Sequence, residues 1–337
     1  MKKSKTESVE MLGERKIIEI IQSRLAAMPD MAVPFGDDVA AVNLDDKQVA
    51  VLKTDMLVGK TDVPPKMTLW QAARKALVMN VSDFASKGVQ PMAALVALGL
   101  PKTFTQKDVE EIADGLNAGA REYGAFVVGG DTGEASDLVI SISLFGTAPK
   151  KVLMLRSGAK PGDVLAVTGL FGKSAAGLRL LLDERCSASA DVGGVLLDAV
   201  LMPHARLAVG LALAGSGVVS ASVDSSDGLA WSLHELAKMS GVGFVVEDVP
   251  VAGEVRRFAE VNGVDALELA LYGGEEYELV VTVKPEGFAA AKSAVEVVGG
   301  CLLPIGKVTG ESGVFLDVGG KRQVVEARGW EHFKSRV

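Results

Sequence analysis

The sequence has few of the residues on which sulfur and zinc chemistry depend. Only two of its 337 residues are cysteines, Cys186 and Cys301, and they form no Cys-x-x-Cys pair. This excludes a disulfide framework and a thiolate metal site, and we interpret both residues as reduced, buried thiols. The three histidines stand far apart and form no His-Glu-x-x-His pair. Zinc hydrolysis and a Ser-His-Asp mechanism are therefore not indicated.

Positive charge and long apolar runs are also scarce. Lys and Arg number 35 against 43 Asp and Glu, a formal net charge of −8. We expect no nucleic-acid partner, because such binding needs clustered cations that release counterions. The longest apolar runs, Pro91–Leu100 and Leu207–Val219, fall short of the about 18 residues that span a bilayer. Met1–Leu12 has three lysines but no apolar stretch behind them, so we predict no signal peptide, no membrane contact and a cytoplasmic protein.

The remaining composition is that of a globular chain of two domains. Hydrophobic residues make up 48% and charged residues 23%, which excludes a disordered, collagen-like or coiled-coil protein. At about 100 to 200 residues per domain, the length predicts two domains, each with its own core. The local composition changes near residue 150, where Pro149-Lys150-Lys151 is followed by a segment rich in turn-forming residues, Ser157 to Asp163. We place the boundary there, with domains at 1–149 and 150–337.

Glycine and proline divide the chain into alternating strand-like and helix-like segments, which predicts a mixed α/β fold. Apolar residues recur at helical spacing from Leu69 to Phe84, and Gly88 is placed to end that helix. We predict helices at 9–27, 68–87, 105–123, 172–183, 203–214, 229–239 and 285–297. We predict strands at 48–54, 91–99, 125–129, 138–147, 163–168, 218–224, 243–247, 276–283, 301–307 and 313–317.

Aspartates recur where these apolar elements end. The turns concerned are Gly36-Asp37-Asp38, Thr54-Asp55, Gly129-Gly130-Asp131-Thr132 and Asp224-Ser225-Ser226-Asp227-Gly228. A single turn aspartate is usually structural, because Asp caps helices and closes turns. Asp83 is different, since it lies inside the helix at 68–87 beside a core-facing Phe84 and needs a partner there. If such acids converge, cations must neutralise them, and an oxygen-rich cluster suits Mg²⁺.

The common nucleotide-binding motifs are absent. Gly169-Leu170-Phe171-Gly172-Lys173-Ser174 resembles a phosphate loop, but a P-loop would need glycine where Val167 stands. We interpret the segment as a turn from a strand into a helix that packs on a sheet. No Gly-x-Gly-x-x-Gly follows a predicted strand, so a dinucleotide fold is not supported.

Eight motifs in one order resemble those of thiamine-monophosphate kinases, from the superfamily of aminoimidazole ribonucleotide synthetase, selenophosphate synthetase and a hydrogenase-maturation protein. They are Gly36-Asp37-Asp38, Thr54-Asp55-Met56-Leu57-Val58, Asn80-Val81-Ser82-Asp83, Gly129-Gly130-Asp131-Thr132, the segment from Arg156 to Asp163, the segment from Asp224 to Leu229, the segment from Gly273 to Leu279, and the segment from Gly329 to Phe333. The resemblance implies ATP-dependent phosphorylation of thiamine monophosphate to thiamine diphosphate. It also implies two α/β domains, the N-terminal one pairing its sheet across the two-fold axis of a homodimer and the C-terminal one closing the site.

The resemblance further implies roles for individual residues. Several Mg²⁺ ions would be held by Asp38, Lys53, Thr54, Asp55, Asp83, Asp131, Asp224 and Asp227, with Lys53 and Thr54 acting through backbone or hydroxyl oxygens. Catalysis would rest on Asp55, Asp131, Asp224 and Asp227. ATP would contact Gly130, Asp131, Arg156 and Ser226, and the acceptor would contact Asp62, Glu275 and Trp330.

Three positions depart from the family pattern. Lys53 stands where a Ser or Thr is expected, Asp62 stands in the place of a substrate-facing histidine, and Glu276 replaces the commoner Asp. The acceptor's phosphate is already largely deprotonated near neutral pH, so the reaction needs positioning and positive charge rather than a general base. Two alternatives stay open: another ATP-dependent enzyme of the superfamily with a different acceptor, and a non-catalytic nucleotide-binding relative.

Overall fold

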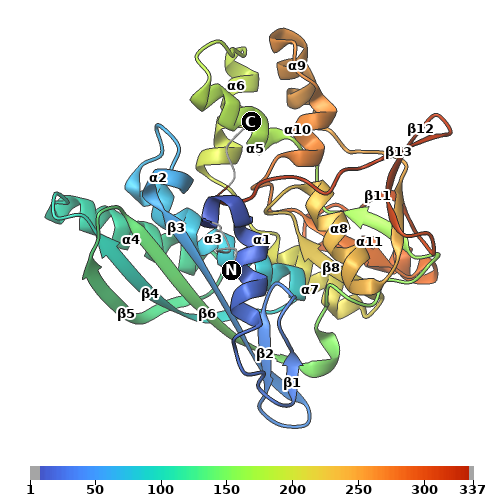
Figure 1. Cartoon of the computed structure of the whole chain (residues 1–337), viewed down its shortest axis with the longest axis horizontal. Coiled ribbons are helices and arrows are strands. Elements are labelled where there is room, and N and C mark those ends of the chain that lie inside the picture. The colour runs from blue at the N-terminus through green and yellow to red at the C-terminus, as the bar shows by residue number, and fades with distance from the viewer. Residues whose placement is uncertain (1–7, 334–337) are drawn as a thin grey trace, which may run out of the picture.

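A computed structural model describes residues 8–333 of the chain. Residues 1–7, with the three N-terminal lysines, lie outside this range. Two sheets lie side by side, the N-terminal one toward the left of Figure 1 and the C-terminal one toward the right. Within residues 8–333 no helix combines the length and apolar character that crossing a membrane requires.

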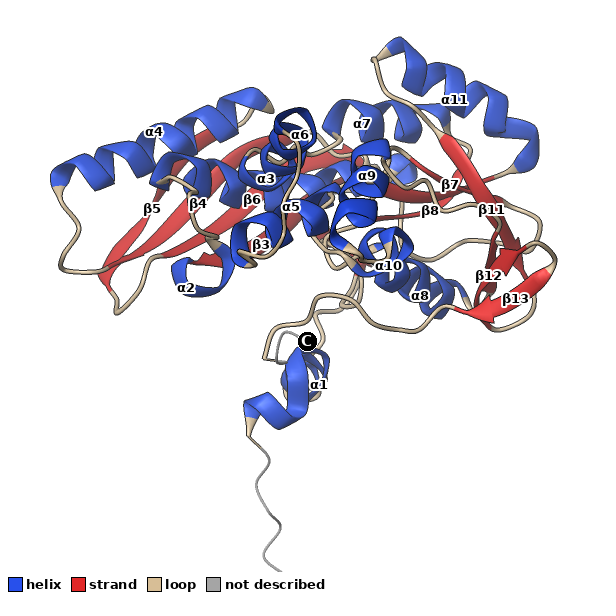
Figure 2. Cartoon of the chain, turned by 90° about the horizontal axis from the view of Figure 1, so that it is seen from above, coloured by secondary structure: helices blue, strands red, loops and turns tan. Residues whose placement is uncertain are grey.

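The N-terminal sheet has the strand order β1-β2-β3-β6-β4-β5, in which only β4 and β5 run parallel. Its strands are β1 (Met31–Val33), β2 (Ala40–Asn43), β3 (Gln48–Val58), β4 (Pro91–Leu100), β5 (Phe126–Glu134) and β6 (Val139–Pro149). Helices α3 (Leu69–Lys87) and α4 (Gln106–Glu122) cover one face. The short α2 (Gly59–Asp62) follows β3, and α1 (Val9–Gln22) lies apart from both sheets in Figure 2.

The C-terminal sheet has the order β13-β12-β9-β11-β7-β10-β8. Its strands are β7 (Val164–Val167), β8 (Val219–Asp224), β9 (Gly243–Val246), β10 (Leu279–Val283), β11 (Leu303–Thr309), β12 (Gly313–Val318) and β13 (Lys321–Val324). The helices of this half are α5 (Lys173–Leu182), α6 (Ala190–Leu201), α7 (Leu207–Ser216), α8 (Leu229–Ser240), α9 (Gly253–Asn262), α10 (Ala266–Tyr272) and α11 (Phe288–Val297). Short 3₁₀ turns, η1 (Lys150–Val152) and η2 (Pro285–Gly287), precede β7 and α11.

Helix α3 joins the two halves. Fifteen of its nineteen residues are buried, because it packs on the N-terminal sheet, on α4 and α7, and on β8 of the C-terminal sheet. A capping box starts it, with the Thr68 hydroxyl accepting from the Gln71 amide, and Gly88 ends it in the left-handed conformation. A helix buried on nearly every side carries its polar residues into the interior, where each requires a partner.

Several predicted elements differ from the structure. The strands predicted to end near residues 54 and 129 continue to Val58 and Glu134, so Asp55 and Asp131 lie within strands and the prediction that they close them was wrong. The backbone ladders continue past the apolar residues, with Asp55 opposite Ile142 and Asp131 opposite Ala97. The sequence patterns did not predict seven of the observed elements, namely β1, β2, β13, α2, α6, α9 and α10.

The interpretation of both cysteines as buried was also wrong. Cys186 is partly buried and Cys301 is exposed. Cys301 lies just before β11, and its thiol donates to the carbonyl of Thr168 at 3.1 Å. The sequence did not indicate that Cys301 is exposed, because this residue belongs to an apolar segment. It lies at the end of that segment that reaches the surface.

Candidate active site

A cavity of about 1560 Å³ lies where β3, α3, β8 and α1 come together. It gathers twelve of the residues proposed from the sequence, namely Asp38, Lys53, Thr54, Asp55, Asp62, Asp83, Arg156, Asp224, Ser226, Asp227, Glu275 and Trp330. They come from both halves of the chain and from segments up to about three hundred residues apart. The acids scattered along the sequence are therefore brought to one place by the packing of the two sheets around α3.

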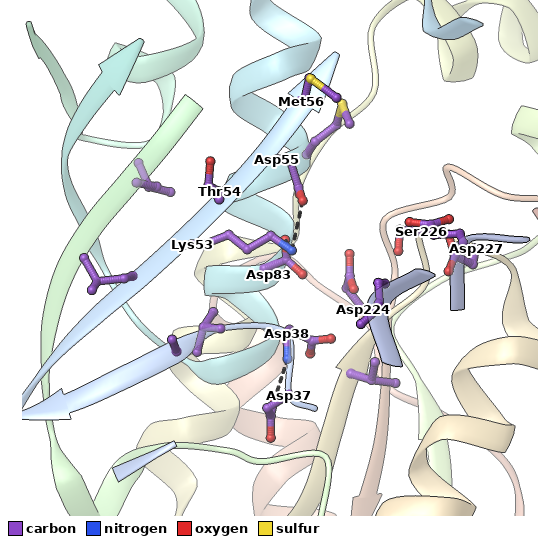
Figure 3. A pocket seen from close by; sticks show the side chains of 18 of the residues that line it. Asp37, Asp38, Lys53, Thr54, Asp55, Met56, Asp83, Asp224, Ser226 and Asp227 are labelled. Atoms are coloured by element: carbon purple, nitrogen blue, oxygen red, sulfur yellow. Dashed lines mark hydrogen bonds and ion pairs between the residues drawn. The ribbon is translucent and has the colours of Figure 1, made fainter. Parts of the chain in front are cut away.

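Three buried aspartates form the centre of this cavity. Asp38 lies in the turn between β1 and β2, Asp83 on α3 and Asp224 at the end of β8, and each offers a carboxylate oxygen within 4.8 Å of the other two. Figure 3 shows the three side chains pointing toward one another. Hard oxygen ligands grouped this closely fit Mg²⁺, which prefers carboxylates, water and phosphate oxygens. The donor set therefore suits the metal expected from the sequence.

Two cations neutralise Asp38. The Arg156 side chain donates from Nε to Oδ1 of Asp38 at 2.7 Å and from Nη2 to the same oxygen. Oδ2 of Asp38 lies 2.7 Å from Nζ of Lys87, a side chain with no exposed surface, and accepts from the Ser86 hydroxyl at 2.8 Å. Burial alone would raise the pKa of Asp38, but the charges of Arg156 and Lys87 lower it below the ordinary value. Asp38 is therefore held ionised.

Asp83 and Asp224 lack such strong compensation. Burial, together with the neighbouring carboxylates, raises the pKa of Asp83 well above its ordinary value, although Lys53 opposes the shift. Burial and the charge of Asp38 raise the pKa of Asp224 to about 7, while the Ser82 hydroxyl, which donates at 2.7 Å, acts in the opposite direction. Both raised pKa values indicate that too little positive charge surrounds Asp83 and Asp224 to stabilise their ionised forms. A divalent cation at this point would supply it.

The side chain of Lys53 is paired with carboxylates, so the backbone oxygen predicted from the sequence is the one metal ligand that this residue can offer. Its ammonium lies 3.1 Å from Oδ1 of Asp55 and 2.9 Å from Oδ2 of Asp83. An ammonium group has only donors and cannot coordinate a metal. Thr54 alternates to the other face of β3, where its hydroxyl accepts from Ser143 at 3.4 Å, so this hydroxyl does not face the triad. Only the backbone oxygens of these two residues remain as ligands.

Gly130 and Asp131 do not line the cavity within the single chain. Strand register places Asp131 in one row with Ala97, Ser141 and Met56, on the sheet face that α3 and α4 leave uncovered. Lys53 and Asp55 alternate to the opposite face, toward α3. The structure therefore does not bring Asp131 to the triad, and its roles in metal and ATP binding stay predictions.

Asp227, Ser226 and Trp330 lie on the C-terminal side of the cavity. The Trp330 amide donates to the carbonyl of Asp227 at 3.0 Å, which fixes the C-terminal segment beside the loop before α8. Arg15 on α1 lies over the ring of Trp231 at 3.5 Å and reaches Asp227 at 3.7 Å. Helix α1 therefore closes this side by a cation–π contact and an ion pair.

A second cavity of about 940 Å³ adjoins the first and shares Arg15, Asp62, Glu275 and Trp330 with it. Glu275 is held by Nζ of Lys75 at 2.6 Å, and its backbone has a positive φ of 63°. The Asp62 carboxylate accepts from the backbone amide of Val58 at 2.7 Å, so it stabilises the turn at α2 as well as lining both cavities. Trp330 and Tyr272 supply aromatic surface here.

Several residues of the site were not found from the sequence. Lys87 bridges Asp37 and Asp38, each at 2.7 Å, and Ser82, Lys75 and Arg15 hold acidic groups. Ser82 stands within a motif quoted above, and Lys87 lies one turn after Asp83 on the same helix. A buried acid on a helix could have indicated that a neighbouring lysine is buried with it.

Comparisons with known proteins identify the two domains and their fold. Residues 36–148 match the AIR synthase related protein N-terminal domain, and residues 160–319 match the corresponding C-terminal domain. The solved structure of AaThiL complexed with AMPPCP and TMP has a TM-score of 0.85 at 31% identity, covering 98% of this chain and all of that one. At 20% identity and a TM-score of 0.66, a hydrogenase maturation protein HypE shares the fold.

Curated relatives give the family. A thiamine-monophosphate kinase of Nitrosopumilus maritimus is 35% identical over 323 residues, covering 96% of this chain and 99% of the relative. The enzyme of the same name from Escherichia coli K12 is 33% identical, covering 90% of this chain and 93% of the relative. Because archaeal and bacterial members align over nearly their whole length, the chain belongs to the thiamine-monophosphate kinase family.

Proposed function

We propose that this chain transfers the γ-phosphoryl group of ATP to thiamine monophosphate, giving thiamine diphosphate and ADP. The observation that carries the proposal is the triad of Asp38, Asp83 and Asp224, set beside Arg156 in a cavity formed by both halves of the chain. Membership of the family supplies the identity of the two substrates. The site supplies carboxylates for metal and a guanidinium for phosphate.

The chemistry requires these groups because both reactants are anions. A bound Mg²⁺ ion would supply positive charge that offsets the negative charge of the phosphates on both reactants. Asp38, Asp83 and Asp224 would hold it, with Asp55 and Asp227 at the edges of the cluster. The acceptor oxygen needs no general base, since the second pKa of a phosphate monoester is near 6.

Arg156 and Ser226 would contact the phosphates of ATP. A guanidinium presents a planar set of donors that matches phosphate geometry, and Arg156 is 22% exposed at the cavity wall. Its partners in the structure are Asp38 and, at 3.5 Å, Glu235. A metal ion on Asp38 would take over that carboxylate and leave Arg156 able to turn toward phosphate oxygens.

Glu275 and Trp330 would contact thiamine monophosphate in the adjoining cavity. The thiazolium ring is positively charged, which suits both an aromatic face and a carboxylate. Asp62 shares this cavity but also accepts from the Val58 amide, so we assign it to shaping the acceptor site through α2. Mg²⁺ and ATP complete the set of small molecules proposed for the chain.

A homodimer is part of the proposal. The uncovered face of the N-terminal sheet, which we call the open face, carries Leu52, Met56 and Leu95 with 45%, 55% and 53% of their surfaces exposed. Val128 on β5 is also exposed, at 63%. Apolar surface on one sheet face fits pairing with a second copy of the chain. Asp131 lies in this face and would then be at the interface.

The direct test is to mix the protein with Mg-ATP and thiamine monophosphate and to detect thiamine diphosphate by mass. Asp224→Asn and Asp131→Asn should each abolish product formation in a folded protein. An unchanged rate in both variants would contradict the metal assignment. ATP consumption that depends on formylglycinamidine ribonucleotide, with none on thiamine monophosphate, would favour another enzyme of the superfamily. ATP binding without turnover on either acceptor would favour a non-catalytic relative.

A further inference from the structure

Lys53 is the residue of the site whose position the proposed reaction does not explain. Its side chain is 19% exposed, and its ammonium lies between the carboxylates of Asp55 and Asp83, at 3.1 and 2.9 Å. Figure 3 shows the Lys53 side chain extending from β3 toward Asp55 and Asp83.

The charges around the triad divide into two groups. Asp37 and Asp38 share Lys87 and Arg156, so they are already compensated by two cations. Among residues 8–333, Asp55 and Asp83 form ion pairs with one cation, Lys53. Without that lysine, the two carboxylates that now bind one ammonium, at 3.1 and 2.9 Å, would lose the positive charge between them, and a divalent ion is the cation that would replace it.

An ammonium and a divalent ion cannot occupy this gap together. Mg²⁺ lies at about 2.0–2.1 Å from its oxygen ligands, and Ca²⁺ and similar ions at about 2.3–2.6 Å. An ion bound to both Asp55 and Asp83 would therefore stand within contact distance of the Lys53 ammonium, and two positive charges at that separation repel strongly. The lysine must leave before such an ion can enter.

We propose that Lys53 is a built-in cation that occupies the position between Asp55 and Asp83, so that the nucleotide-free chain binds one divalent ion, on Asp38, Asp83 and Asp224, instead of two. The inference rests on the proposed function only in taking the triad as the metal site. Lys53 acts through Asp55 and Asp83 and is a positioning residue. It fixes both carboxylates before any metal arrives and reduces the number of ions that must be collected from solution.

The test counts bound Mn²⁺ per chain without nucleotide, from the electron paramagnetic resonance signal of the free ion. Wild type should bind one ion and Lys53→Met two, because the neutral side chain has nearly the same length. Lys53→Arg keeps the charge and should bind one. Lys53→Met with Asp55→Asn should return the count to one, since the second site loses a ligand. Lys292→Met, at an exposed position of α11, is the matched control and should match wild type.

Equal counts for Lys53→Met and wild type would overturn the inference, and so would two ions in wild type. If Lys53→Met does not fold, wild-type crystals soaked in MnCl₂ decide the question by anomalous scattering. One peak at the triad and none touching Asp55 is the expected result. A peak bonded to both Asp55 and Asp83, or no peak at the triad, contradicts it. Because no nucleotide or acceptor is present, the result does not depend on whether the chain makes thiamine diphosphate.

Discussion

Asp224 shows at the scale of a single residue how burial and function conflict. Its carboxylate is buried between the two halves, and the charge it needs for metal binding is disfavoured there, so the pKa rises to about 7. The hydroxyl of Ser82 is the neutral donor that keeps the group oriented. A metal ion on the triad would convert this unfavourable group into a ligand.

Asp224→Asn should lower kcat at least about 100-fold, equivalent to about 2.7 kcal/mol, because the metal loses a charged ligand. The amide oxygen can still accept from Ser82, so the fold should persist. Steady-state rates with saturating ATP and acceptor measure the effect. Asp114→Asn, an exposed change on α4, is the control and should leave the rate unchanged. A wild-type rate in Asp224→Asn would remove this residue from the mechanism.

Glu276 gives a pH-dependent prediction. Burial raises its pKa from 4.5 to about 7, although the amide and hydroxyl of Ser174 donate to it at 3.0 and 2.9 Å. Between these two values the folded state holds a proton that the unfolded state has lost, so the free energy of unfolding falls as pH rises from about 4.5 to about 7. Above about pH 7 both states are ionised and the contribution stays constant.

The glutamine side chain in Glu276→Gln cannot ionise, so the free energy of unfolding of this variant should not show the decrease that Glu276 causes. The free energy of unfolding of wild type should decrease relative to the variant, by on the order of 2 kcal/mol between pH 4.5 and 7.5. Urea unfolding in EDTA at several pH values provides the measurement. Glu286→Gln, at an exposed position, should follow wild type throughout. A constant difference between wild type and Glu276→Gln across this range would show that the pKa is not raised.

At the scale of elements, β5 depends on glycine for its pairing with β4. A Cβ atom at Gly130 would lie 1.8 Å from the carbonyl oxygen of Val96, its partner in the ladder, whereas one at Gly133 would meet nothing within 4 Å. Two glycines of one strand therefore have different roles. Gly130, which the resemblance implies contacts ATP, is needed at this position because the backbones of β4 and β5 approach too closely for a side chain.

Gly130→Ala should destabilise the fold by about 1–3 kcal/mol, since β4 and β5 must separate to admit the methyl group. Gly133→Ala should change stability by less than about 0.5 kcal/mol. Thermal or urea unfolding of the two variants gives a matched comparison within one strand. Similar losses in both would mean that strand propensity, rather than the contact with Val96, sets the effect.

At the scale of the whole molecule, the open face determines the oligomeric prediction. Leu95→Asp places a charge in the centre of this face, beside Ser143 and Thr54 in one row. It should convert a dimer into a monomer in light-scattering measurements after gel filtration, because burying an unpaired carboxylate at an interface is costly. Val297→Asp, on α11 and 86% exposed, should leave the dimer intact.

If Leu95→Asp has the molar mass of wild type and wild type is dimeric, the interface lies elsewhere on the molecule. If wild type is a monomer, the homodimer predicted from the resemblance does not form. In the first case Asp131 would have no place at the interface, and its proposed contact with ATP would need another explanation.

Local sequence determined much of the architecture. Helical periodicity and caps located α3 within one residue of its observed bounds, and β-branched runs located most strands. These features act over a few residues and need no tertiary information. Short elements such as β1, β13 and α10 were missed because their apolar patterns span too few residues for a period to be recognised.

The sequence by itself determined which acids the site has, since the motifs name Asp38, Asp83 and Asp224 directly. Only the tertiary structure decided which of them meet and what neutralises them. The Ser82–Asp224 bond joins residues 142 positions apart, and the Arg156–Asp38 pair joins residues 118 apart. Spacing along a chain fixes geometry within one element, whereas such contacts depend on how two sheets pack around α3. For the same reason, only the fold showed that Lys53 holds two carboxylates and that Asp131 faces the other side of the sheet.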